Sequence, residues 1–473
     1  MTASLLLLYA SYAALGWALL RALGVQRRAA PGGLLLYMGI GTLLGLGAST
    51  VVLFALELTR VRLTLAAYVA ASVAVAALLG RVRRREGRAM RWPSWREFHP
   101  ATAVACLALA FPITLAMWRA LALPVTPRDA IVGMDLVAQY AAEEGRLASS
   151  LFSVEHLQGK LSNQPYYAPF TALSQTLGYL GGAAYGKAWL AALPLGLVMM
   201  LGGALRQTLH PAFAAALVAS LVAAPAFYGY SFMVLADYAS AAFFGLGALA
   251  LYRYRGKAWP GLQISDGAVL ALASVAFGFA TWSRSETLGL VVPLALAVAV
   301  KAWPLGRGPA LRRALLLGAG AVAAFVLWHV VFIPFYLGGG PANLLAWDGA
   351  RALGTNAARL AEQLSRTDQY GYVLALGAIG AAVSLVCFQS ERGLFYLFTA
   401  AVVVAGLLVL VSIAPAASAV NTAKRGFFRL LPLVVLYLGV CPALTRPSDW
   451  LTRWERGEAG LGSGSGNAAP EGG

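Results

Sequence analysis

The sequence predicts an all-α polytopic membrane protein with about thirteen transmembrane helices. Hydrophobic residues make up 60% of the 473 residues and charged residues only 12%, whereas soluble domains average about 45–50% apolar and about 25% charged residues. Apolar runs of about 20 residues, long enough to cross a bilayer, recur from the first residues to about Val440. These two observations exclude a soluble protein, because the excess apolar surface must face lipid.

The individual helices are predicted from apolar runs separated by charged or Pro- and Gly-rich breaks. They cover residues 3–23, 33–56, 63–80, 101–122, 187–205, 211–228, 237–252, 267–283, 287–303, 313–333, 370–389, 393–412 and 427–445. The first run lacks a basic leading region and a clear cleavage site, so we expect a retained helix and not a signal peptide. A further apolar stretch, residues 165–185, is short and interrupted by Pro and Gly. We expect it to form an amphipathic helix in the outer interface.

The distribution of basic residues orients these helices. An odd number of crossings places the two termini on opposite sides of the membrane. With the N-terminus outside, most Lys and Arg residues lie inside, including the seven from Arg81 to Arg96, as the positive-inside rule requires. A crossing by residues 165–185 would move the later basic clusters outside. The C-terminal residues 446–473 are then expected to be a flexible cytoplasmic tail.

The net charge of +17 does not indicate a nucleic-acid partner, and the cysteines do not indicate a metal centre. The basic stretch from Arg81 to Arg96 lies between two apolar runs and has no aromatic platform for bases. Cys106, Cys387 and Cys441 lie in or at the end of apolar runs, with no second Cys or His at ligand spacing. A metal cluster or a disulfide framework is not expected.

The acidic residues are concentrated at the predicted outer ends of helices. Asp129, Asp237 and Glu286 lie there, and almost no carboxylate is placed at mid-membrane depth, where ion-coupled transporters usually need one. Such a layout is typical of a reaction centre at a membrane surface. A local role also explains Asp129, because acids in first turns cap helices and complement their dipoles. Asp135 lies about 240° around a helix from Asp129, so the two do not share a face.

Two aromatic segments lie near these acids. In SNQPYYAPF, residues 162–170, Gln164, Tyr166 and Tyr167 could line a groove that binds a sugar, or the tyrosines could anchor the interface. In FYGYSFMVLADYASAAFF, Asp237 and Tyr238 lie at the outer start of a helix. There Asp237 is either a helix cap or part of a site.

Basic residues on the outer side require an explanation, because positive charge is disfavoured there. Arg284 lies with Glu286 in a very short turn that is either a solvated hairpin or a place where Arg meets an anionic head group. Lys424, Arg425 and Arg429 form a second outer basic set. Arg425 and Arg429 are four residues apart and share a helix face. A phosphate ligand is the natural partner for such a set.

Taken in order, these segments resemble the GT-C superfamily of membrane glycosyltransferases, which includes the mannosyltransferase-like and aminoarabinose-transferase-like families. The resemblance covers roughly residues 101–445 and rests on the order of the motifs. It implies transfer of a sugar, with inversion, from a polyprenyl-phosphate carrier outside the cytoplasm. The family's first-loop Asp falls on Asp129, its Ala-Asp pair on 236–237, and its Arg/Lys-x-Glu motif on Arg284 and Glu286.

From the resemblance and the residue chemistry we expect Asp129 to be the catalytic base, supported by other acids. Arg284, Arg425 and Arg429, with Lys424 in a lesser role, would bind the donor phosphate. The supporting acids would be Asp237, Glu286 and Asp135, and the residues contacting the acceptor or the sugar would be Gln164, Tyr166, Tyr167 and Tyr238.

The sequence also departs from the family pattern. Where related sequences often have His-Pro-x-Tyr, this chain has Gln-Pro-Tyr-Tyr at 164–167, so no His role is transferred. Arg128 and Ala130 flank Asp129, where some members have a second acid, so a divalent metal is not indicated. No large outer C-terminal domain follows, which disfavours recognition of a peptide acceptor.

The expected organisation follows from these points. Residues 1–100 would be accessory helices with a basic inner loop, residues 101–445 the GT-C-like catalytic domain, and residues 446–473 the tail. The implied partners are a polyprenyl-phosphate sugar donor, a glycan, lipid or protein acceptor, and membrane lipids. We expect a bacterial inner membrane location with the active site outside. The alternative function is a transporter or flippase for a lipid-linked or anionic solute, which would use the same basic residues.

Overall fold

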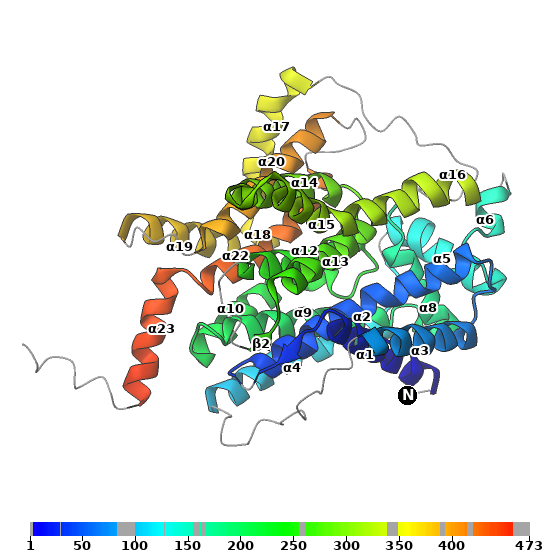
Figure 1. Cartoon of the computed structure of the whole chain (residues 1–473), viewed down its shortest axis with the longest axis horizontal. Coiled ribbons are helices and arrows are strands. Elements are labelled where there is room, and N and C mark those ends of the chain that lie inside the picture. Colours follow the sequence, from blue (N-terminus) through cyan, green and yellow to red (C-terminus); the bar gives the residue numbers. More distant parts are fainter. Residues whose placement is uncertain are drawn as a thin grey trace, which may run out of the picture.

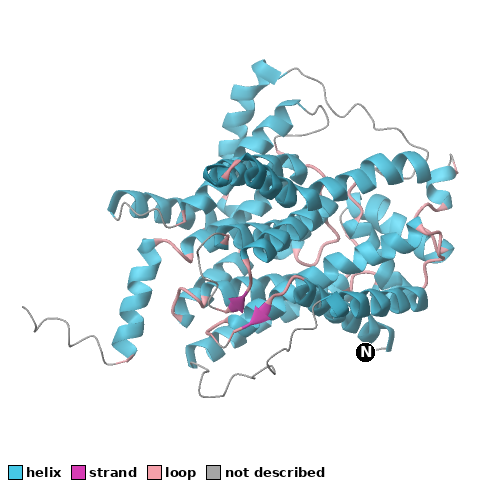
Figure 2. Ribbon diagram, viewed as in Figure 1, coloured by secondary structure: helices cyan, strands magenta, loops and turns pink. Residues whose placement is uncertain are grey.

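A computed structural model of the chain describes residues 3–28, 30–82, 100–126, 128–154, 161, 167–254, 261–337, 349–387, 393–413 and 420–456. Within these residues the protein is built almost entirely from helices (Figures 1 and 2). The two strands in the described part of the chain have two residues each and pair antiparallel, with Gln26 opposite Gln263.

The elements of the described residues, in chain order and with η marking short 3₁₀ or π segments, are α1 (Ala3–Ala22), β1 (Gln26–Arg27), α2 (Gly33–Leu58), α3 (Leu65–Val82), α4 (Pro100–Ala122), η2 (Ala130–Met134), α5 (Asp135–Glu144), α6 (Ser150–Ser153), α8 (Phe170–Gly181), η3 (Ala183–Tyr185), α9 (Trp189–Leu205), α10 (Pro211–Val222), α11 (Pro225–Tyr230), α12 (Ala236–Arg253), β2 (Leu262–Gln263), α13 (Asp266–Ser283), α14 (Thr287–Ala302), η4 (Trp303–Leu305), α15 (Arg307–Phe325), η5 (Val326–Phe332), α16 (Ile333–Tyr336), α17 (Gly349–Leu364), α18 (Thr367–Tyr370), α19 (Val373–Cys387), α20 (Leu394–Ile413), α21 (Asn421–Gly426), η6 (Phe427–Arg429), α22 (Leu430–Leu438) and α23 (Pro442–Glu455).

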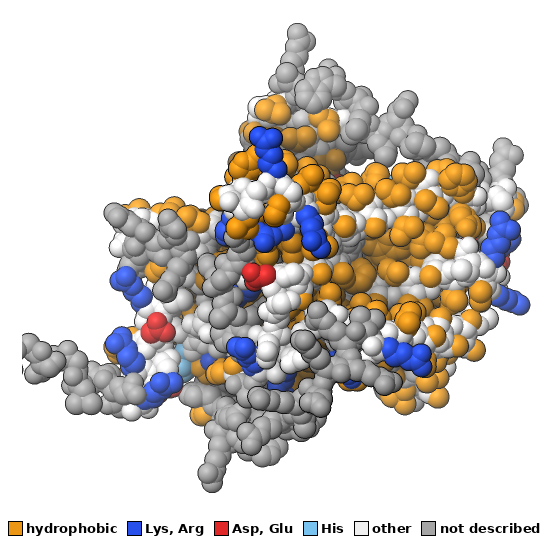
Figure 3. Space-filling model, viewed as in Figure 1, with side chains coloured by type: hydrophobic (Ala, Val, Ile, Leu, Met, Phe, Trp, Pro, Cys, Tyr) orange, Lys and Arg blue, Asp and Glu red, His pale blue; other side chains and the backbone are white. Residues whose placement is uncertain are grey.

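The prediction of an all-α membrane protein is confirmed. Among the described residues, seven helices are long and apolar enough to cross a membrane, or eight if the bent pair formed by α21–α22 and α23 is one span. Hydrophobic side chains cover much of the face shown in Figure 3, as expected of a surface in contact with lipid. A helix occupies each of the thirteen predicted ranges, but several of these helices are shorter than a full span. The count of thirteen crossings therefore stays a prediction.

Small residues bring the first helices into close contact. A Cβ atom added to Gly16 on α1 would lie 1.9 Å from the carbonyl oxygen of Gly41 on α2, and one added to Gly45 would lie 1.9 Å from that of Tyr12. Gly41 and Gly45 have the small-xxx-small spacing that lets helix backbones approach within a membrane. The same helix α2 packs against α9 through further glycines. The N-terminal helices are thus joined firmly to the rest of the bundle.

The helices that carry the candidate site meet at their ends. Helix α12 packs on α13, α13 and α14 both pack on α15, and α22 packs on α12 and α20. The start of α12, the turn between α13 and α14, and the segment from α21 to η6 therefore lie together. Each of the three contributes charged side chains to one place.

The stretch at 165–185 contains a helix that is too short to cross. Helix α8 has 12 residues, or about 18 Å, against a hydrocarbon core of about 30 Å. Every residue from Phe170 to Gly178 is buried, and the helix packs against α5, α2 and α1. It is covered by protein, which differs from the open interfacial position that we expected. The reason is that two of its polar residues, Gln175 and Tyr179, have hydrogen-bond partners on neighbouring helices.

The C-terminal region differs from the expected flexible tail. Residues 446–455 belong to helix α23, and Ser448 within it accepts a hydrogen bond from the backbone of His210. The contact fixes this part of the chain against the start of α10. Residues 457–473 lie outside the described residues.

If α8 does not cross, the residues on either side of it lie on the same side of the membrane. Ser153 and Ala184 flank α8 and are exposed. With the three native cysteines replaced by alanine, Ser153→Cys and Ala184→Cys should both react with an impermeant maleimide added to the same side of sealed vesicles. Reaction of only one of the two would show that the segment crosses.

Candidate functional site

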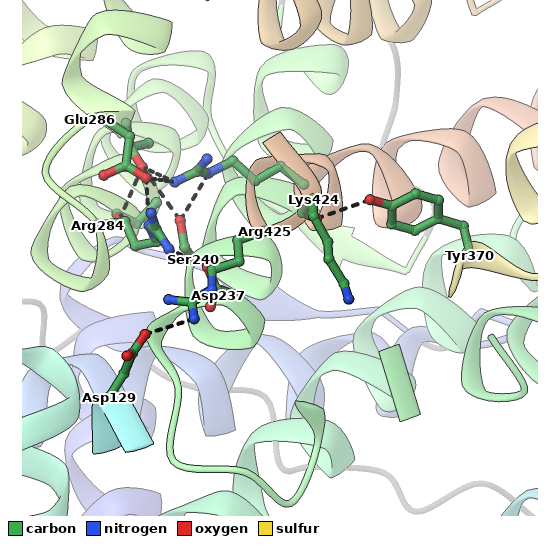
Figure 4. A network of polar contacts seen from close by, with 11 residues as sticks. Asp129, Asp237, Ser240, Arg284, Glu286, Tyr370, Lys424 and Arg425 are labelled. Atoms are coloured by element: carbon green, nitrogen blue, oxygen red, sulfur yellow. Dashed lines mark hydrogen bonds and ion pairs between the residues drawn. The ribbon is translucent and has the colours of Figure 1, made fainter. Parts of the chain in front are cut away.

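A group of three arginines and three carboxylates lies where the helix ends meet (Figure 4). Its centre is Glu286, whose Oε1 accepts from Nε of Arg284 at 2.5 Å and from Nη2 of Arg429 at 3.1 Å. Arg284 also forms an ion pair with Asp237 through Nη1. One carboxylate oxygen therefore links two guanidinium groups that are separated by more than 140 positions in the chain.

Arg429 is deeply buried, with 1% of its side chain exposed. Its Nε donates to Ser240 Oγ at 3.0 Å, and its Nη2 also donates to Thr287 Oγ1 at 3.1 Å. Its buried Nη1 has no hydrogen-bond partner, and a buried polar group without a partner is costly. Arg429 is thus a fixed cation with one unused donor.

The ion pair between Arg425 and Asp129 is more open. Arg425 Nη2 donates to Asp129 Oδ2 at 2.7 Å, and the two side chains are 25% and 29% exposed. Figure 4 shows Arg425 reaching toward Asp129 beside Asp237. The formal charges of the three arginines and the three carboxylates cancel. An anionic ligand would therefore have to compete with a carboxylate for an arginine. Arg425 is the arginine most open to this competition, because its partner Asp129 is the most exposed of the three carboxylates.

Electrostatics keep the centre of the group charged. Burial opposes ionisation of Glu286, but the positive charges of Arg284 and Arg429 outweigh it and lower its pKa to about 2. Burial likewise opposes the charge on Arg284, and Glu286 and Asp237 overcome it and raise the pKa of Arg284. Glu286 therefore accepts hydrogen bonds at neutral pH and is not suited to donate a proton.

Two tyrosines border the group. Burial raises the pKa of Tyr167, and the positive charges of Arg284 and Arg425 oppose this increase. Burial also raises the pKa of Tyr230, which lies near Asp237 and Arg425, and its ring centroid is 4.4 Å from that of Phe428.

Tyr230, Ser240 and Thr287 were missed by the sequence reasoning. Ser240 lies three residues after Asp237 and so shares its helix face, which was a usable signal. Thr287 directly follows Glu286. No local pattern distinguishes Tyr230 from the other interface tyrosines.

Asp135 lies in a different polar group. Its carboxylate is 4% exposed and accepts from Gln139 Nε2 at 2.8 Å, from Gln175 Nε2 at 2.5 Å and from the Tyr179 hydroxyl at 2.7 Å. Gln175 in turn accepts from Trp189 at 2.7 Å. These bonds tie α5 to α8 and α9. None of these three partners is an arginine of the first group, and the expected role of Asp135 as a supporting acid there stays a prediction.

The remaining predicted site residues are less favourably placed. Tyr238 is 2% exposed and packs against Phe227 with ring centroids 4.5 Å apart, so it has no face open to a sugar. Lys424 extends its side chain away from the group in Figure 4, while its backbone oxygen accepts from the Tyr370 hydroxyl at 3.0 Å. Gln164 and Tyr166 lie outside the described residues.

No group of three His, Cys, Asp or Glu side chains suited to a metal ion occurs in the described part of the chain. The chain matches no protein-family model, no curated protein and no solved structure. The function is therefore inferred from the site itself.

The link between Arg284 and Arg429 should make stability depend on Glu286 and on pH. Removing one partner from a buried charge pair costs about 3–5 kcal/mol, and we expect about 3 kcal/mol for Glu286→Gln, because Glu286 is 22% exposed. The ionised carboxylate stabilises the fold fully above its ordinary pKa of 4.5, and this contribution is lost as the pH falls through about 2. Thermal unfolding in detergent should show the two proteins converging as the pH falls from about 5 to about 2.

Asp368→Asn is the control for this experiment. Asp368 pairs with Arg366 at 2.7 Å, but both side chains are largely exposed, at 62% and 41%. Exposed ion pairs contribute little to the free energy of unfolding, so the unfolding temperature of this variant should be close to that of the wild type. A difference in unfolding temperature between wild type and Glu286→Gln that does not change with pH would contradict the stabilising role of the ionised Glu286.

Proposed function

We propose that the protein is an inverting glycosyltransferase. It would move a sugar from a polyprenyl-phosphate carrier to a lipid or cell-envelope glycan acceptor at the outer face of a bacterial inner membrane. The observation that carries the proposal is the convergence of Arg284, Arg425 and Arg429 with Asp129 at one end of the bundle. A lipid-phosphate donor needs such fixed positive charge at a membrane surface.

The arginines suit the leaving group of this reaction. As the bond between the anomeric carbon and the phosphate oxygen breaks, its electron pair goes to the phosphate, which leaves as an anion. A planar guanidinium binds phosphate oxygens through two parallel hydrogen bonds. The unused Nη1 donor of Arg429 supports this role, and Glu286 keeps Arg284 and Arg429 in fixed positions. The group needs no proton donor for the phosphate.

Asp129 is suited to be the base. The acceptor hydroxyl oxygen forms the new bond to the anomeric carbon, and its proton must go to a carboxylate. Asp129 is the most exposed of the three carboxylates, so an acceptor can reach it. Asp237 and Glu286 are engaged by Arg284, which makes them supporting residues.

Arg425 would couple donor binding to the base. Because Arg425 binds Asp129, a donor phosphate that engages Arg425 competes with this carboxylate. Asp129 would then be released toward the acceptor when the donor is in place.

The proposal includes the finer topology. The thirteen crossings, an outer location of the site and a catalytic domain over residues 101–445 fit the placement of basic residues. Residues 1–100 would be accessory, because they supply none of the six charged residues.

Asp129→Asn should lower the rate of sugar transfer by at least about 100-fold, the low end for removing a positioned base. The same change frees Arg425, so binding of the polyprenyl-phosphate donor should be retained or become several-fold tighter. Transfer of radiolabelled sugar and donor binding would be measured in proteoliposomes, with Asp368→Asn as control. Wild-type turnover in the folded variant would refute the assignment of Asp129 as the catalytic base. Movement of the lipid by the wild type without any transfer would favour the transporter.

Arg425→Gln should weaken binding of the donor by about 1.5–3 kcal/mol, the range for hydrogen bonds to charged groups. Arg359→Gln is the matched control, since Arg359 is an exposed arginine on α17. It lies between the predicted helices 313–333 and 370–389, in a segment that the predicted topology places outside. It should leave donor binding unchanged. Equal losses in both variants would show that only general surface charge attracts the lipid.

A further inference from the structure

A second feature lies between α4, α9 and α10. These helices enclose a cavity of about 310 Å³, lined by residues such as Ile113, Val198 and Ala214. Apart from Thr114 and Arg206, the side chains that line it are apolar. The cavity is separate from the residues of the proposed catalytic group.

The lining residues show that the cavity is a groove running along α9. They include Leu195, Val198, Gly202 and Arg206, which recur at three- or four-residue spacing and so form one stripe of the helix. From Leu195 to Arg206 the groove extends about 16 Å at 1.5 Å per residue. A Cβ atom added to Gly202 would meet nothing within 4 Å, so the groove is open at that point.

A cation marks one end of this apolar groove. Arg206 follows the last residue of α9, and its Nη1 donates to the carbonyl oxygen of Leu209 at 2.8 Å. Burial lowers the pKa of Arg206, because its charge is partly removed from water. The other donors of a guanidinium remain suited to a phosphate.

This end is opposite to the catalytic group. Lys187, just before α9, contacts the backbone of Leu123 at the end of α4, and Asp129 follows shortly after. Arg206 lies at the other end of α9. A smaller cavity of about 10 Å³ shares Ile113 and Val198 with the groove and reaches Tyr238, but it has room for only about one water molecule. A lipid tail cannot pass through it from the catalytic group.

We propose that this groove holds one acyl chain of an acidic phospholipid, with the lipid phosphate bound by Arg206. The groove supplies an apolar wall, and Arg206 supplies a positive charge directly after the candidate span Ala183–Leu205, where an anionic head group would lie. Only an amphiphile places an anion at the end of an apolar groove in a membrane. The inference does not depend on the glycosyltransferase proposal, since it uses neither the donor nor the six charged residues.

The test measures the phospholipid that stays with the full-length protein in mild detergent, by native mass spectrometry. The protein is first equilibrated with mixed phosphatidylglycerol and phosphatidylcholine. Wild type should retain phosphatidylglycerol in preference to phosphatidylcholine. Arg206→Gln should reduce that preference about tenfold, the low end for losing hydrogen bonds to a charged group. Gly202→Phe should fill the groove and reduce retention of both lipids.

Gly318→Phe is the matched control, because a Cβ atom at Gly318 on α15 also meets nothing within 4 Å. It should leave lipid retention unchanged. Size-exclusion profiles and unfolding temperatures establish that each variant is folded. If Gly202→Phe does not fold, Arg206→Gln still tests the proposal, since the hydrogen bond that it removes is the one to the carbonyl oxygen of Leu209. Equal retention of the two lipids by wild type, or unchanged preference in Arg206→Gln, would overturn the proposal. Displacement of the phospholipid by a polyprenyl phosphate would also overturn it and assign the groove to the donor tail.

Discussion

The sharing of one Glu286 oxygen by Arg284 and Arg429 is the interaction on which the candidate site depends. Removing a charged side chain from water costs several kcal/mol unless an opposite charge and good hydrogen bonds compensate it. Arg429 is 1% exposed and receives this compensation from Glu286, Ser240 and Thr287. Without Glu286 the two arginines would repel each other at close range. The turn between α13 and α14 therefore fixes the position of η6.

The six charged residues divide into a rigid part and an open part. Asp237, Arg284, Glu286 and Arg429 are bonded to one another, and all of them except Glu286 are at most 10% exposed. Asp129 and Arg425 form a separate pair whose side chains are 29% and 25% exposed. A rigid part can hold a phosphate in one orientation without reorganising during the reaction. An open part can exchange partners as substrates arrive. The arrangement thus joins preorganisation with access in a single group.

The Asp135 group shows what a structural polar cluster in the same protein looks like. Its carboxylate accepts one hydrogen bond from Gln139 on its own helix and two from Gln175 and Tyr179 on α8, and it has no arginine among these partners. Such a saturated group stabilises packing and has nothing left to offer a ligand. The Arg429 group differs in one respect that matters, since one of its buried donors is unused. The two groups also differ in composition, because Asp135 is bonded to amides and a tyrosine, whereas Glu286 is bonded to two arginines.

The sequence by itself determined the helices and their class. Apolar runs of membrane length can form only helices in lipid, because every backbone polar group must be satisfied within the segment, and a helix lies in each predicted range. It also pointed to Arg284, Glu286, Arg425 and Arg429 as outer charges in need of partners. Only the tertiary structure decided which partners they have. The bonds from Arg425 to Asp129 and from Arg429 to Glu286 join positions about 300 and 140 residues apart, and no local spacing encodes them. Nor could spacing reveal that Asp135 turns toward α8, or that Phe227 covers Tyr238, since burial depends on which helix packs against a given face.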